Sequence, residues 1–293
     1  MGNWKDVQTT CRNNNPVKVK DGTSNLGVTA GPSSGRQPVP PGVLMAWNWE
    51  GHGHLTAAAI DELRKQLPSD VQAILRWVGT QRQTQNRDIT DVPTLGHWTP
   101  EGQRHHFMKY SGQTDQDAYD VAVAWIFSEA TLAAELLRSR LGPRRRYQES
   151  GDWGLGEQQE SVGPHLGNAL HSLQDSFAPG HVKRDSDLVI RGINIYDKEN
   201  KHPTEPGKPG HAEYDASWKD KEGHLTALGQ AAADASVVLI LFFLHTAYGH
   251  TAQANAQKEI LLEKYLRLNP SSEAAPGGGV EKQQGAAAGR WIG

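Results

Sequence analysis

Two short blocks of the chain, HSLQDSFAPGH and HAEYD, contain histidine and aspartate at a spacing suited to metal binding. His171 and Asp175 are four residues apart, as are His211 and Asp215. On a helix, this spacing brings both side chains of a pair to one face. His181 follows the first pair closely. Because imidazole and carboxylate are ligands that zinc accepts, the pattern predicts a metalloprotein.

Further candidate ligands precede these blocks. WNWEGHGH contains His52 and His54 just before an expected helix, and because they are two residues apart we expect only one to face the site. The alternative is that both are solvent-exposed loop histidines. Asp88 and Asp91 in NRDITDVP are either ligands or ordinary loop and capping residues. The pair His105–His106 is either a ligand source or a partly buried, hydrogen-bonded histidine pair.

The block around His171 is the most informative of these segments. An apolar stripe accompanies it, so we expect His171 and Asp175 to face inward beside that stripe. A buried carboxylate needs a cation or several hydrogen-bond donors. A purely structural His–Asp hydrogen bond is the alternative, and the additional histidines make it less economical. The stripe consists of Leu166, Leu170, Leu173 and Phe177.

Helical periodicity dominates the chain between its two ends. Only LVIRGINIY (188–196) is typical of a hairpin arm. The apolar run Val237–Leu244 is too short to span a bilayer and indicates a buried core helix. We therefore expect an all-α multi-helix bundle with a metal cleft. The expected helices cover 55–67, 69–77, 115–141, 162–177, 224–248 and 254–268.

Composition divides the chain into three parts. Residues 1–44 and 270–293 are rich in Gly, Pro, Ser and other small or polar residues, which predicts a flexible leader and a disordered tail around one domain over 45–269. Cys11 is the single cysteine, which excludes an intrachain disulfide and a thiolate metal cluster. The net charge of −3 provides no global basic surface for nucleic acid or anionic membrane. No conventional signal peptide is visible at the N-terminus.

The order of these motifs resembles the zinc-dependent phospholipase C and fungal single-strand nuclease superfamily. The similarity spans about residues 47–250, and His-x3-Asp-x5-His is its most specific part. The matching elements are Trp49–His54, Asp91, His106-Phe107, His171-x3-Asp175-x5-His181 and His211-x3-Asp215.

This resemblance implies an all-helical enzyme that holds about three zinc ions. It also implies that Asp91 orients or deprotonates the attacking water. Asp175 would bridge two ions. The implied ligand groups are Asp91, His106, His171 and Asp175; then His181, His211 and Asp215; then His54, the backbone of Trp49 and Asp175.

The tryptophan departs from the family pattern. In that family it is the mature N-terminus, and its free amine binds zinc, whereas 48 residues precede Trp49 in this chain. Either the leader is removed by proteolysis, or the third site uses a different group. Glu50, His52 or a competing Trp47–His52 register are the alternatives.

The resemblance implies phosphodiester hydrolysis by a metal-activated water. We expect phospholipase C-type cleavage of phospholipid, with peripheral membrane contact. The reason is that the segment HSLQDSFAPGH is similar in sequence to the corresponding segment of bacterial phospholipase members. Asp215 instead resembles the nuclease branch, so a single-strand nuclease or 3'-nucleotidase acting on single-stranded nucleic acid is the alternative. The resemblance also implies that this protein is secreted or extracytoplasmic. Aromatic residues available for base stacking are Trp98, Tyr110, Trp153, Tyr196 and Trp218.

A non-enzymatic function is the second alternative. In that case the chain is either a helical protein with purely structural metal sites or an interaction module carried on the leader.

Overall fold

The computed structural model describes residues 49–78, 100–110, 112–141, 159–195 and 218–269, and these are mostly helical, as expected. The predicted leader and tail lie outside these ranges. The helices are α1 (Trp49–Arg64), α2 (Ser69–Val78), α4 (Pro100–His105), α5 (Asp115–Leu141), α6 (Gln159–Asp175), α8 (Ala227–Tyr248) and α9 (Thr251–Ile260), followed by a π-helical turn, η3 (Leu261–Tyr265). The strands are β1 (Val182–Arg184) and β2 (Ile190–Ile193).

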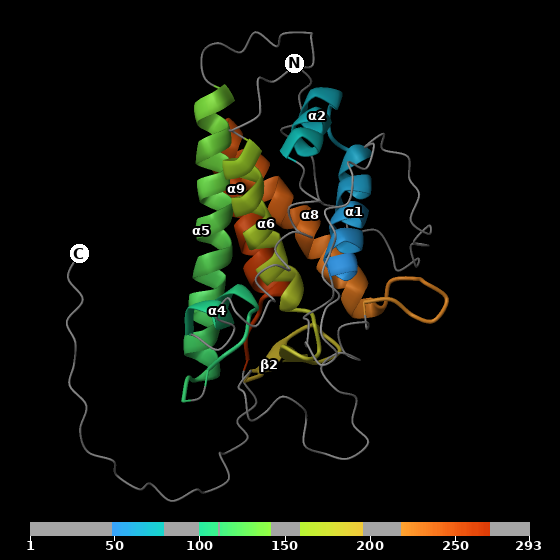
Figure 1. Ribbon diagram of the computed structural model, residues 1–293, viewed down its shortest axis with the longest axis vertical. Coiled ribbons are helices and arrows are strands. Elements are labelled where there is room, and N and C mark those ends of the chain that lie inside the picture. The colour runs from blue at the N-terminus through green and yellow to red at the C-terminus, as the bar shows by residue number, and fades with distance from the viewer. Residues whose placement is uncertain (1–48, 79–99, 111, 142–158, 196–217, 270–293) are drawn as a thin grey trace, which may run out of the picture.

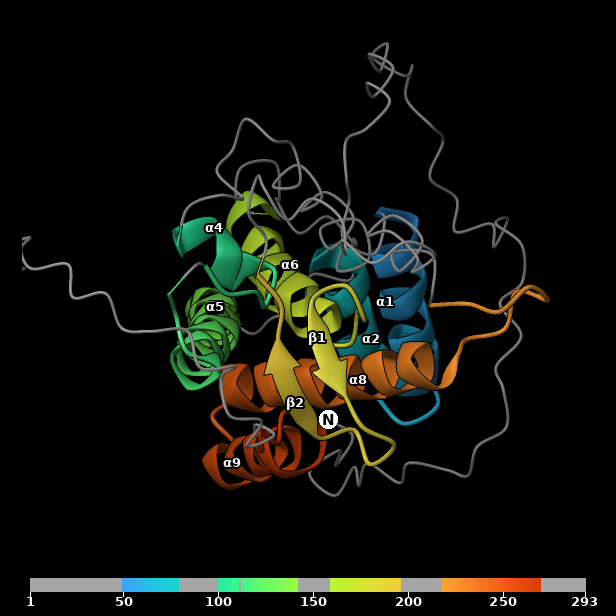
Figure 2. The same ribbon diagram turned by 90° about the horizontal axis from the view of Figure 1, so that it is seen from below.

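Helix α8 is central to the described part of the fold. It packs against α1, α5, α6 and α9, and Figure 2 shows it running past α5, α6 and α1 on one side of them. Thr226 caps its first turn by accepting a hydrogen bond from the Gly229 N–H at 3.2 Å, and Gly249 ends it in the left-handed conformation. The apolar run Val237–Leu244 is buried throughout, which confirms the predicted core helix.

By length and composition, α8 is also long and apolar enough to cross a membrane. However, 78% of its most apolar window is buried inside the protein. Core helices of many proteins have the same composition, so this property carries little weight.

Helices α5 and α6 lie side by side along one flank of the bundle (Figure 1). Helix α5 has the predicted bounds, whereas α6 begins three residues before the predicted start and ends at Asp175. A polar contact joins the two helices: the buried Glu129 carboxylate accepts hydrogen bonds from Asn168 at 2.5 Å and from His165 at 2.9 Å. The predicted apolar stripe of α6, from Leu166 to Phe177, is buried.

Helix α1 begins earlier than expected. It begins at Trp49 rather than at residue 55, so His52 and His54 belong to its first turns rather than to a preceding loop. Glycine lowers helix propensity, which hides this start in the sequence. A close contact explains one of the glycines, because a Cβ atom on Gly51 would lie 2.9 Å from Cδ1 of Trp218.

A small antiparallel hairpin follows α6 at the end of the bundle (Figure 1). Strand β2 lies within the predicted arm, whereas β1 was not expected because it is only three residues long. The half-buried guanidinium of Arg184 holds this hairpin in place. It donates hydrogen bonds to the carbonyl oxygens of Ser176 at 2.9 Å and Tyr265 at 2.7 Å, and it stacks on Phe177.

Candidate metal centre

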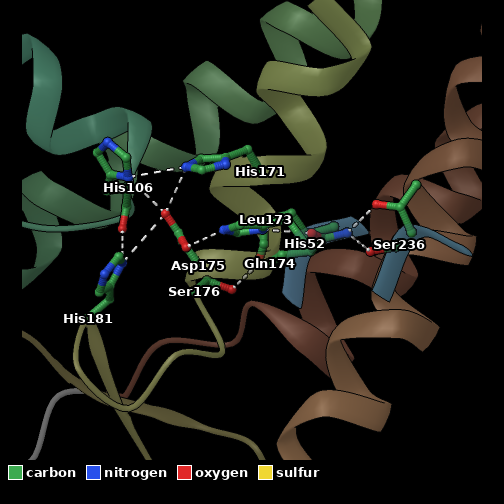
Figure 3. Close-up of polar contacts among 10 residues, drawn as sticks. His52, His106, His171, Leu173, Gln174, Asp175, Ser176, His181 and Ser236 are labelled. Carbon is green, nitrogen blue, oxygen red and sulfur yellow. Dashed lines mark hydrogen bonds and ion pairs between the residues drawn. The ribbon is translucent and has the colours of Figure 1, made fainter. Parts of the chain in front are cut away.

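The inward face of α6 carries the two residues that the sequence singled out. His171 and Asp175 lie one turn apart, and their side chains are 2% and 0% exposed. The apolar stripe of α6 packs into the core and turns both side chains toward the interior. An anionic carboxylate at this depth requires several partners, and Figure 3 shows histidines around it.

Three potential ligand atoms converge on one side of Asp175. Its Oδ2 lies 2.9 Å from Nδ1 of His106 and 3.3 Å from Nε2 of His171, and those two nitrogens are 3.2 Å apart. Ligand atoms about 2.0–2.1 Å from a tetrahedral zinc ion are separated from one another by roughly 3.3 Å. The triangle therefore already has the dimensions of one face of a metal site.

The other carboxylate oxygen of Asp175 faces a different helix. Its Oδ1 lies 3.2 Å from Nε2 of His52 on α1 (Figure 3). The His52 ring stacks on that of His171, with centroids 4.2 Å apart. His52, His171 and Asp175 thus form a buried group whose ligand atoms lie close enough together to hold a metal ion.

The chain after α4 supplies His106 through an unusual backbone conformation. Phe107 has a positive φ of 51° although it is not glycine, and it is buried. Such strain is retained where the surrounding structure determines it, often at functional sites. The turn brings the carbonyl oxygen of His106 to 2.7 Å from Nδ1 of His181. Because a carbonyl only accepts, His181 Nδ1 carries the hydrogen and Nε2 keeps a lone pair suited to a ligand.

The protonation states also suit metal binding. Burial lowers the pKa of His171 to about 4, and His52 and His181 reinforce this effect, so its imidazole is neutral at pH 7. Burial alone would raise the pKa of Asp175. Positive charge on His181, His171 and His52 in the acid range where this carboxyl titrates, together with a hydrogen bond from His106, outweighs burial and holds that pKa well below its usual value. Neutral imidazole and anionic carboxylate are the forms that bind metals.

Four of the predicted ligands are therefore brought together: His106, His171, Asp175 and His181. His54 is not among them, because it stacks on Trp218 with centroids 5.0 Å apart and lies 3.6 Å from Glu50. Trp49, whose backbone the resemblance selected, is the first residue of α1. The other predicted ligands, Asp91, His211 and Asp215, lie outside the described residues, as do Asp88 and Trp47.

His52 is the site residue that the resemblance did not select. Trp49–His54 was the preferred match and His52 one of the alternatives, and the structure places His52 at Asp175. The two-residue spacing indicated that only one histidine would face the site, but not which one. Gln174, which is buried beside His52 and contacts it at 2.8 Å, had no signal in the sequence.

No protein-family model, curated protein or solved structure matches this chain. The functional assignment therefore depends on the geometry of this centre and on the motif resemblance.

Proposed function

We propose that the chain is a zinc-dependent phosphodiester hydrolase, with phospholipase C-type cleavage of phospholipid as the preferred reaction. One observation carries this proposal: the two carboxylate oxygens of Asp175 face different histidines. Oδ2 faces His106 and His171, whereas Oδ1 faces His52. This is the arrangement of a carboxylate that bridges two metal ions, and paired ions suit phosphodiester hydrolysis.

The number of ligands supports an open site rather than a structural one. Structural zinc sites are closed by four protein ligands. The described residues already place four histidine side chains around the Asp175 carboxylate, which makes five candidate ligands: His52, His106, His171, His181 and Asp175. The predicted ligands Asp91, His211 and Asp215 would add further positions, so about three ions per chain remain our expectation.

The residues themselves do the positioning. The neutral ring of His171 and the anionic Asp175 are poised to bind a cation without first releasing protons at pH 7. When bound, zinc lowers the pKa of a coordinated water and neutralises charge on phosphoryl oxygens. We propose that Asp91 orients or deprotonates that water.

One of the predicted stacking residues gives no support to the nuclease alternative. Trp218 is buried and stacks on His54, whereas Tyr110 is exposed; Trp98, Trp153 and Tyr196 lie outside the described residues. A buried indole cannot serve as a stacking surface for a nucleic acid base. A phospholipid substrate remains preferred, and with it a secreted or extracytoplasmic enzyme that contacts the membrane peripherally.

The test combines metal analysis with a substrate panel. Purified protein is analysed for zinc per chain and assayed, with and without chelator, on phosphatidylcholine vesicles, single-stranded DNA and a simple phosphodiester. We expect more than one zinc per chain and chelator-sensitive release of phosphocholine. DNA cleavage without phosphocholine release would support the nuclease instead. One zinc or none, with no hydrolysis of any substrate, would overturn the enzyme and leave the structural alternative.

A further inference from the structure

A hydroxyl group fixes the orientation of the buried Gln174 carboxamide. The Ser236 hydroxyl donates its one hydrogen to the Ala232 carbonyl oxygen at 2.8 Å. Toward Gln174, 3.1 Å away, Ser236 Oγ is therefore an acceptor, and the atom facing it must be the amide nitrogen. The same nitrogen lies 2.9 Å from the Thr56 hydroxyl oxygen. The carboxamide has one orientation that satisfies these contacts.

This orientation determines which nitrogen of His52 carries a hydrogen. With its nitrogen turned to Ser236, Gln174 presents Oε1 to Nδ1 of His52 at a distance of 2.8 Å (Figure 3). An amide oxygen only accepts, so Nδ1 must be the donor. Gln174, Ser236 and His52 are each 0% exposed. The buried chain of hydrogen bonds thus runs in one direction, from His52 to Gln174 to Ser236 to Ala232.

The consequence appears at the opposite nitrogen of the ring. In a neutral imidazole with the hydrogen on Nδ1, Nε2 has a lone pair, and here Nε2 lies 3.2 Å from Oδ1 of Asp175. Two electron-rich atoms at this separation repel each other unless a cation, either a proton on Nε2 or a metal ion, lies between them or beside both. The direction of the hydrogen bonds, which Ser236 fixes, therefore creates a cation-binding position between α1 and α6.

We propose that Gln174 is a positioning residue that holds His52 in its Nδ1–H tautomer and thereby directs the Nε2 lone pair to a metal shared with Asp175. This inference rests on the proposed metal centre. Groups that hydrogen-bond to a ligating histidine set its tautomer and ring orientation, and their loss typically weakens metal binding by about 10–100-fold.

The test compares two substitutions at Gln174. Gln174→Met keeps a long flexible side chain but removes the amide acceptor, so we expect zinc affinity to fall by about 10–100-fold. Gln174→Glu keeps an acceptor for His52 Nδ1–H, and the Thr56 hydroxyl can rotate to donate to the carboxylate, so zinc affinity should be retained. Affinities are measured by competition with a chelating indicator. Equal losses in both variants, or no loss in Gln174→Met, would overturn the inference.

Gln72→Met is the matched control. The Gln72 amide donates to the carbonyl oxygens of Arg64 at 3.1 Å and Leu67 at 2.7 Å, outside the histidine cluster. This variant should lose thermal stability without losing zinc affinity. An affinity loss equal to that of Gln174→Met would show that any lost glutamine contact has this effect, and would contradict a specific role for Gln174.

A direct measurement separates this inference from the proposed function. Nitrogen-15 NMR of the histidine rings reports which nitrogen of His52 is protonated, with or without zinc. We expect a protonated Nδ1 in the metal-free protein and zinc-shifted Nε2 in the loaded protein. A His52 protonated on Nε2 alone would overturn the inference even if the protein is an active zinc hydrolase. A wild-type protein that binds no zinc would end the proposed function, while a protonated Nδ1 would still uphold the tautomer assignment.

Discussion

Trp218 packs against Gly51 so closely that a Cβ atom on the glycine would lie 2.9 Å from the indole Cδ1 and 3.0 Å from Nε1. Real Cβ atoms essentially never come this near to another atom. Gly51 directly precedes His52, so the buried indole sets the position of the part of α1 that faces Asp175. The backbone of Trp218 is even closer to a second glycine, because a Cβ on Gly229 would lie 2.2 Å from the Trp218 carbonyl oxygen.

Gly51→Ala should therefore disturb both the fold and the metal centre. The added methyl group forces Trp218 or the start of α1 to move, at a cost of about 1–3 kcal/mol in the free energy of unfolding. Because His52 moves with the helix, zinc affinity should fall as well. Urea denaturation and zinc titration measure the two effects. Gly192→Ala is the control, since its Cβ would make ordinary contacts at 3.6 and 3.7 Å; matching effects in both variants would refute this role of Trp218.

His52→Ala and His54→Ala form a matched pair two residues apart on one helix. Only His52 reaches Asp175, at 3.2 Å, whereas His54 stacks on Trp218. His52→Ala should lower zinc affinity by at least about tenfold, whereas His54→Ala should leave it within about twofold of wild type. Equilibrium dialysis against zinc gives both values. The reverse ranking would restore His54 as the ligand and contradict the structure.

Asp175→Asn tests the shared carboxylate. The amide keeps the size of the side chain but removes the charge that four histidines surround, so zinc content and hydrolysis should be lost together. The metal-free variant should be less stable than metal-free wild type at pH 7, because the lowered pKa of Asp175 means that the folded protein stabilises its anionic form. Asp185→Asn is the control, in a carboxylate that binds Arg191 at 2.8 Å in the hairpin. Full zinc content and activity in Asp175→Asn would exclude a bridging role.

His245 provides a prediction of pH dependence at a distance from the proposed ligands along the chain. Burial lowers its pKa from 6.5 to about 4, and the nearby His250 adds to the effect. The unfolded chain then binds more protons than the folded one between these values, so stability falls as pH is lowered from 6.5 toward 4. His245→Gln should remove about 2 kcal/mol of the loss between pH 7 and pH 5. Urea denaturation of metal-free protein at both pH values measures it, and an unchanged difference would contradict the assignment.

His171 acts in the same direction, because its pKa is also lowered to about 4. Metal-free wild type contains both histidines, so it should lose more stability than His245→Gln over the same pH interval. The variant still contains His171, so it should retain part of the pH dependence of stability. A variant without any remaining pH dependence would show that His171 is not neutral in the folded protein.

The long helices were predictable from the sequence because each has a clear apolar pattern and a clear end. Helix α5 has its expected bounds, since Gly142 and Pro143 terminate a continuous pattern. The start of α1 was missed because Gly51 and Gly53 weaken the helical signal, and only the packing of Trp218 against Gly51 explains the first of them. The expected helix over 254–268 instead begins at Thr251 and changes to a π-helical turn at Leu261. Short elements such as α4 and β1 carry too few residues for a periodic pattern.

In the candidate site, too, some residues were predictable from local sequence and others depend on how the helices pack. Residues within one helix, His171 and Asp175, were predictable from spacing alone. His52 was not, because the face of α1 that meets Asp175 depends on how α1 packs on α8 and α6, which local sequence does not determine. Gln174 was invisible for a related reason: its contacts with Thr56 and Ser236 join residues 118 and 62 positions apart.

The distances along the chain between the ligands have one more consequence. His106 and Asp175 are 69 residues apart, and His52 contacts Gln174 across 122 residues. An ion held by these side chains would cross-link α1, the segment after α4 and α6, and cross-links that close long loops restrict the unfolded chain most. The single cysteine of this protein cannot form an internal disulfide, so zinc would provide the cross-link instead. Zinc supply during synthesis would then determine how much of the protein survives proteolysis, as well as how much of it is active.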